Sequence, residues 1–80
     1  RLTVEYAAGV QERVPEDKRA ALTGVLANDP RPRYQHDSRR VYALEFAGLE
    51  VKFTVDGDVL TVILAEKKGA LYVGNDQQQR

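Results

Sequence analysis

The sequence contains no cysteine, methionine or tryptophan, and its only histidine is His36. Without cysteine it can form no disulfide, no zinc–thiolate site and no thiol nucleophile. One histidine excludes a His-rich metal site, and a Ser-His-Asp triad would depend on that single residue. Isolated glycines give no phosphate-binding loop. No apolar run approaches the roughly 20 residues that a membrane span needs, and no signal-peptide pattern opens the chain. We therefore expect a cytoplasmic protein without metal, cofactor or membrane partner.

The charges cancel over the whole chain but are unevenly placed. Twelve Lys and Arg balance twelve Asp and Glu, and hydrophobic residues make up 42% of the chain. This composition is typical of a soluble globular domain, which we place at residues 1–73, followed by a flexible tail at 74–80. Four arginines fall within ten residues, opposed only by Asp37: Arg31, Arg33, Arg39 and Arg40. A second basic pair, Lys67 and Lys68, follows the last strong apolar run.

The first half of the chain predicts one strand and one firm helix. Residues 2–6 alternate apolar with polar, as in a half-buried strand, and residues 8–14 could form one or two helical turns. Pro15 begins a predicted helix over 15–27, with acidic residues in the first turn and a single apolar stripe. Asn28 and the two prolines that follow end it.

The second half predicts a meander of strands at 41–47, 50–55, 59–65 and 70–73. Asp56-Gly57 indicates a type I′ hairpin turn. The nearly continuous apolar run at 59–65 predicts a central strand covered on both faces. The fold class that follows is α+β, with the helix packed on one face of an antiparallel sheet of four strands, or five if residues 2–6 also pair in it.

Three features could carry chemistry, and each also has an ordinary structural explanation. The loop 28–40 interleaves Tyr34 and His36 with four arginines, which suits phosphate binding and base stacking but also a merely solvated loop. Lys52 lies on the polar side of its strand, as many surface lysines do. Tyr72 follows the Lys67-Lys68 pair and could instead pack its ring on the sheet. Together these side chains suffice for metal-free RNA cleavage through the ribose 2′-hydroxyl.

The order of elements and two longer segments resemble the RelE/ParE family of small bacterial type II toxins. Residues 15–32 are similar to the family's second helix and its closing Asp-Pro phrase. Residues 41–64 are similar to its central hairpins, and Lys68 with Tyr72 resembles its terminal basic-x-x-apolar-Tyr pattern. The sequence departs from the family where Glu50 or Val51 stands in place of an arginine.

This resemblance implies a RelE-like fold and the toxin component of a type II toxin–antitoxin system. The implied activity is metal-independent cleavage of mRNA at the ribosome, with a cognate antitoxin as partner. The implied catalytic residues are Lys52, Lys68 and Tyr72, and the implied RNA-phosphate ligands are Arg33, Arg39, Arg40 and Lys67. The alternative is a non-catalytic or gyrase-directed protein of the same fold that acts by protein–protein binding.

Apolar residues outside the predicted elements suggest a contact surface. Val10, Val14 and Leu49 have little chain to cover them, and an exposed apolar patch is usually a binding site. We therefore expect either self-association or a partner protein, unless the loop 28–40 folds back over the patch.

Overall fold

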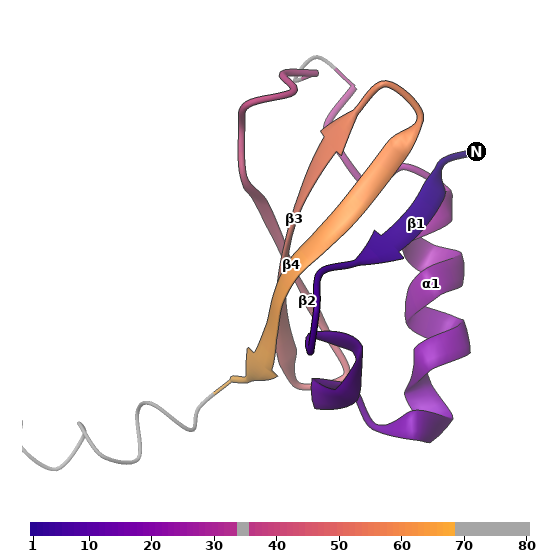
Figure 1. Cartoon of the computed structure of the whole chain (residues 1–80), viewed down its shortest axis with the longest axis vertical. Helices are drawn as coiled ribbons and strands as arrows, with labels where there is room; N and C mark the ends of the chain where they lie inside the picture. Colours follow the sequence, from indigo (N-terminus) through magenta and orange to yellow (C-terminus); the bar gives the residue numbers. More distant parts are fainter. Residues whose placement is uncertain (34–35, 69–80) are drawn as a thin grey trace, which may run out of the picture.

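The computed structural model describes residues 1–33 and 36–68, which form one helix layer beside one four-stranded sheet (Figure 1). The elements, in chain order, are β1 (Thr3–Tyr6), the 3-10 turns η1 (Gln11–Arg13) and η2 (Glu16–Lys18), α1 (Arg19–Ala27), β2 (Tyr42–Phe46), β3 (Leu49–Asp56) and β4 (Val59–Lys67). The predicted helix at 15–27 is therefore present, with its first turn in 3-10 geometry. The predicted strand at 70–73 and the predicted tail at 74–80 lie outside the described residues.

The sheet is mixed, which corrects the prediction of an antiparallel sheet. Its strand order is β1-β4-β3-β2, with β1 parallel to β4 and both other pairs antiparallel. The reason is the direction of α1, which returns the chain to the end from which β1 started, so that the Leu2 N–H donates to the Ala27 carbonyl at 2.8 Å. β2 then runs as β1 does, and two hairpins reverse the chain twice. β4 must therefore run parallel to β1.

The hydrophobic core lies between the sheet and the helical segment. The side chains that are almost fully buried come from every part of this layer: Val14, Leu22, Leu26, Val51, Phe53, Val55, Leu60 and Val62. Leu49 is also buried, and Val10 packs partly buried against the cluster. The prediction that Val10, Val14 and Leu49 form an exposed patch is therefore wrong. These residues are covered because η1 and the chain leading to Pro15 fold over that end of the sheet.

Two tight hairpins connect the last three strands. In the first hairpin, Ala47 and Gly48 join Phe46 to Leu49. Their φ values of 50° and 79° are both positive, which makes this a type I′ turn. In the second hairpin, Asp56 pairs with Val59, so the central residues are Gly57 and Asp58, and only Gly57 has positive φ. The second hairpin is predicted correctly in place, but its turn has the type II′ pattern instead of type I′.

β4 is a central strand, as predicted, but within residues 1–33 and 36–68 only one of its faces is covered. Leu60, Val62 and Ala65 are buried toward the helix side, whereas Ile63 is 40% exposed. The pairing shifts at Lys52 and Phe53, which leaves Ile63 as the extra residue of a β-bulge. α1 lies on one side of the sheet, beside β1, and no described helix covers the other side, which is called the open face below (Figure 1).

Candidate nucleic-acid interface

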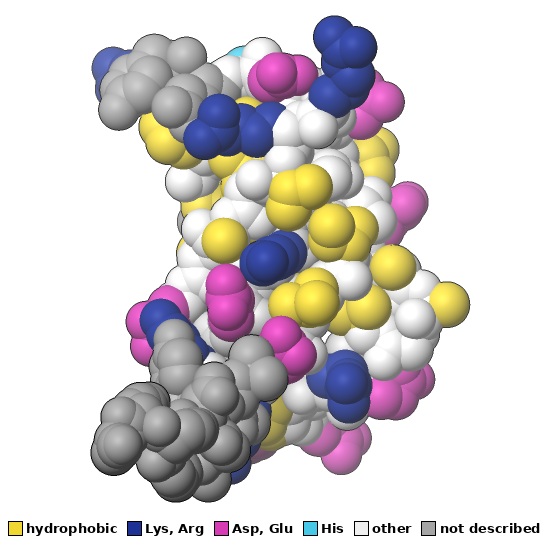
Figure 2. All heavy atoms as spheres, turned by 90° about the vertical axis from the view of Figure 1, so that its left-hand side faces the viewer, with side chains coloured by type: hydrophobic (Ala, Val, Ile, Leu, Met, Phe, Trp, Pro, Cys, Tyr) yellow, Lys and Arg dark blue, Asp and Glu magenta, His cyan; other side chains and the backbone are white. Residues whose placement is uncertain are grey.

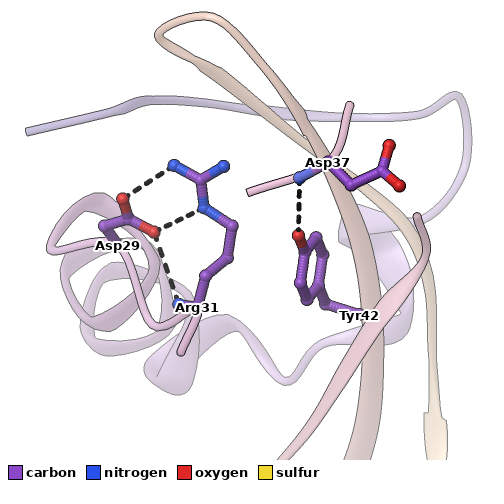
Figure 3. Close-up of polar contacts among 4 residues, drawn as sticks. All are labelled: Asp29, Arg31, Asp37 and Tyr42. Carbon is purple, nitrogen blue, oxygen red and sulfur yellow. Dashed lines mark hydrogen bonds and ion pairs between the residues drawn. The ribbon is translucent and has the colours of Figure 1, made fainter. Parts of the chain in front are cut away.

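The arginine-rich loop connects the end of α1 to the start of β2, at the end of the sheet where β1 and β4 also begin. Figure 1 shows it at the top of the molecule, away from the end at which β4 finishes. Tyr34 and Gln35 lie outside the described residues, so the loop is described at 28–33 and 36–41. Two anchors hold these described parts in place (Figure 3).

The first anchor is a bidentate ion pair between Asp29 and Arg31. The Arg31 Nε and Nη2 atoms donate to the two carboxylate oxygens of Asp29, each at 2.8 Å, and the Arg31 backbone N–H donates to the same group at 3.3 Å. The Arg31 side chain is only 9% exposed. The hydrogen bond from Arg31 lowers the pKa of Asp29 from 3.8 to about 2, and the same bond is the main cause that raises the pKa of Arg31. The Arg31 guanidinium therefore serves to hold the loop and is not presented to a ligand.

The second anchor is Tyr42, the first residue of β2. Its ring stacks on Phe53 with centroids 5.5 Å apart and planes 18° from parallel. Its hydroxyl accepts a hydrogen bond from the Asp37 backbone N–H at 3.1 Å. Tyr42 also contributes to the raised pKa of Arg31, and its hydrogen bond to Asp37 ties the second described part of the loop to the core.

The remaining arginines of the loop face solvent. Arg33, Arg39 and Arg40 are exposed. The Arg40 guanidinium carbon lies 5.6 Å from the centroid of the Tyr42 ring, which is a cation–π contact. The Asp37 carboxylate accepts from the Arg39 backbone N–H at 2.9 Å, which fixes the turn that presents Arg39. Figure 2 shows Lys and Arg side chains at this upper end of the molecule, next to acidic ones.

The lysines predicted as site residues are not brought to this end. Lys67 pairs with Leu49, and Leu49 with Phe46, so Lys67 lies beside the far end of β2, about 13 Å or more from Arg40 by strand length. Lys52 pairs with Ala43 and Leu64 on the open face, nearer the middle of the sheet. Lys68 follows β4 and donates from Nζ to the Glu45 carboxylate at 3.4 Å. Tyr72 lies outside the described residues.

The open face is acidic where the strands β2, β3 and β4 lie side by side. Glu45 pairs with Glu50, and Glu50 with Glu66, so three carboxylates form one row across the sheet. Figure 2, which looks from the side opposite α1, shows acidic, hydrophobic and basic side chains on this face. Such a face repels a polyanion. Among the described residues no group of His, Asp and Glu is arranged to hold a metal ion, and no helix has the length and apolar character to cross a membrane.

The sequence identified the arginines that face solvent but missed the residues that position them. Asp29 precedes Pro30 and Arg31, and an Asp two residues before a backbone N–H is the usual signal of an Asx turn. Tyr42 carries no comparable signal, because a tyrosine at the start of a strand fits a packing role equally well.

The family to which the chain belongs is known from a family model. Residues 1–68 match the model of the TrmO C-terminal domain, which covers every element of the fold. The chain therefore belongs to the TrmO C-terminal domain family. No curated protein and no solved structure matches the chain.

This assignment overturns the toxin interpretation. The family model points to a protein associated with tRNA modification, not to a RelE/ParE toxin, so the predicted toxin function and mRNA cleavage are wrong. The resemblance rested on a helix followed by hairpins, an order that unrelated small α+β domains share. The antitoxin partner was implied by that resemblance. The catalytic roles of Lys52, Lys68 and Tyr72 also rested on the chemistry of the side chains, and they stay predictions.

Proposed function

We propose that this chain is an RNA-contacting domain of a tRNA-modifying protein, and that Arg33, Arg39 and Arg40 bind phosphate groups of the tRNA. The family supplies the connection to tRNA modification. The single observation that carries the site is the anchored loop with its three exposed arginines. Guanidinium groups bind phosphate oxygens through two parallel hydrogen bonds, which a lysine cannot provide.

The distribution of charge supports a one-sided contact. The net charge is zero, so no general positive field would draw RNA to the chain. The arginine loop is at one end of the sheet, and the carboxylate row of Glu45, Glu50 and Glu66 is on the open face. A polyanion would therefore approach the loop end and avoid the open face. Lys67, at the far end of β2, stays outside this contact.

The anchors lower the entropic cost of the contact. A flexible loop loses conformational freedom when it binds, and each side chain that is immobilised costs about 0.5–1.5 kcal/mol. Here the ion pair of Asp29 with Arg31 and the hydrogen bond to Tyr42 order the described loop before RNA arrives. Phosphate contacts supply affinity and orientation, not sequence recognition. The residues that act on the nucleotide to be modified would then lie elsewhere in the whole protein.

The test is the salt dependence of tRNA binding. Unmodified tRNA transcript is titrated with the chain and with Arg33→Ala, Arg39→Ala and Arg40→Ala at several salt concentrations. Each substitution should weaken binding and reduce the slope of log K against log salt by about 0.7–0.9, the value of one phosphate contact. Arg13→Ala is the matched control, because Arg13 is exposed in η1, outside the loop. Equal effects of Arg13→Ala and Arg39→Ala would reject the site, and no binding of the unchanged chain would reject the function.

A further inference from the structure

The free edge of β2 has backbone groups that face outward. β2 ends the strand order, with β3 on its other side. Phe46 and Leu49 flank a two-residue turn and therefore form a hydrogen-bonded pair. Along an antiparallel ladder such pairs alternate, so Leu44 and Tyr42 also bond to β3, while the N–H and C=O groups of Ala43 and Glu45 point away from it.

Within residues 1–33 and 36–68 this edge has little protection against strand addition. Edge strands are commonly guarded by short length, proline, charged side chains (above all lysine), a bulge or a covering segment. β2 has five residues with one charged side chain, Glu45, and it contains no proline, lysine or bulge. No hydrogen bond from another part of the described chain reaches the backbone of Ala43 or Glu45. A hollow of about 220 Å³ is lined by residues of β2 together with one from β3 and one that follows β4: Ala43, Leu44, Glu45, Glu50 and Lys68.

We propose that β2 pairs antiparallel with β2 of a second copy of this chain, about a twofold axis at Leu44. Ala43 of each copy then lies opposite Glu45 of the other, and these two pairs exchange N–H···O bonds through the groups that face outward. Leu44 lies opposite its own counterpart, and Tyr42 lies opposite Phe46 on the helix side. Leu44 and Phe46, only partly buried in one copy, thereby gain a covering neighbour.

The charges of the open face favour a second copy over another strand. Within one chain, Glu45, Glu50 and Glu66 form a row of like charge, which Lys68 offsets at Glu45, and like charges opposite each other in a sheet are destabilising. The next row on the same face is Ala43, Lys52 and Leu64. The twofold axis aligns the acidic row of one copy with this second row of the other.

Lys52 then faces the carboxylate row of the second copy across a small residue. Two strand spacings, about 10 Å, separate Lys52 from Glu45 of the other copy, with only Ala43 between them. A lysine and a glutamate side chain together reach that far over an alanine. The contact occurs twice by symmetry, so the surface is complementary to itself, as a twofold interface requires.

The pairing should be weak and dependent on concentration. One short strand per copy buries less than the roughly 1,200 Å² of a standard interface. The zero net charge of the chain imposes no long-range repulsion between copies. This inference goes beyond the proposed function, since it requires no RNA.

The experiment is sedimentation equilibrium of the full chain over a wide concentration range. We expect a reversible monomer–dimer equilibrium for the unchanged chain. Ala43→Pro should abolish the dimer, because it removes an outward N–H, while an edge strand tolerates proline at such a position. Ala43→Ser keeps the N–H and serves as the matched control, with an unchanged dimer. Equal thermal unfolding of both variants shows that the fold is intact.

A charge swap tests the self-complementary surface. Glu45→Lys and Lys52→Glu should each raise the dimer dissociation constant about tenfold, and the double variant should restore it. A strict monomer at all concentrations, or a dimer unaffected by Ala43→Pro, would overturn the proposal. Slow amide exchange at Ala43 and Glu45 in a strict monomer would show that another part of the same chain covers the edge, which also overturns it.

Discussion

The phenolic oxygen of Tyr42 accepts a hydrogen bond of 3.1 Å from the backbone N–H of Asp37, so the first residue of the edge strand β2 holds the middle of the arginine loop. The same ring packs on Phe53, which is 1% exposed. The packing of the Tyr42 ring in the core therefore fixes the position of the loop. A single substitution can therefore remove the hydrogen bond of the Tyr42 hydroxyl and keep the packing of its ring.

Tyr42→Phe should loosen the loop while leaving the fold intact. The ring keeps its stacking on Phe53, and the lost hydrogen bond should lower the free energy of unfolding by about 1 kcal/mol. The Asp37 amide should exchange faster, and affinity for tRNA should fall several-fold because the loop must order on binding. Amide exchange and RNA titration measure the two effects. Unchanged exchange at Asp37 would contradict the anchoring role.

Asp29 should make stability depend on pH at the acid end. The pKa of Asp29 is lowered to about 2 in the folded chain by the hydrogen bond from Arg31, whereas an unfolded aspartate titrates near 3.9. The stabilisation is thus complete above about pH 4 and is lost as the pH falls from about 4 toward 2. Because the Asp29 side chain is 32% exposed, we expect no more than about 1 kcal/mol.

Asp29→Asn is the appropriate variant, because asparagine tolerates the φ of 62° at this position and removes only the charge. Urea unfolding at a series of pH values should show a flatter acid limb for the variant, with the two curves converging near pH 2. Parallel curves over this range would show that the ion pair does not stabilise the fold.

Local patterns predicted the elements well, but not their pairing or their surroundings. Pro15 and the apolar stripe identified the helix, and Gly57 identified the second hairpin, since each signal acts within a few residues. The parallel pairing of β1 with β4 depends on which way α1 runs across the sheet, and no local pattern encodes that direction. Arg31 appeared equivalent to Arg39 because the carboxylate that engages it becomes a partner only in the folded turn.

The two sides of β4 should respond differently to truncation. Val62 is fully buried, so Val62→Ala removes core contacts and should cost about 2–3 kcal/mol. Leu64 lies half-buried on the open face beside Lys52, so Leu64→Ala should cost less than about 1 kcal/mol. Chemical unfolding of both variants measures the difference. Equal losses would mean that the open face is covered as well as the helix side.

The turn at Ala47 and Gly48 contains removable strain. Ala47 adopts a φ of 50°, which places its Cβ near the preceding backbone and costs about 1 kcal/mol for a residue other than Gly, Asn or Asp. Asn-Gly is the preferred pair for a type I′ turn, so Ala47→Asn should raise the free energy of unfolding by about 1 kcal/mol. Ala47→Val, the matched control, should lower it, because a branched Cβ fits this conformation worse. Ala47 is exposed, so neither change disturbs the core. Urea unfolding with an unchanged m-value is the measurement, and a destabilised Ala47→Asn variant would show that the turn is not type I′ in solution.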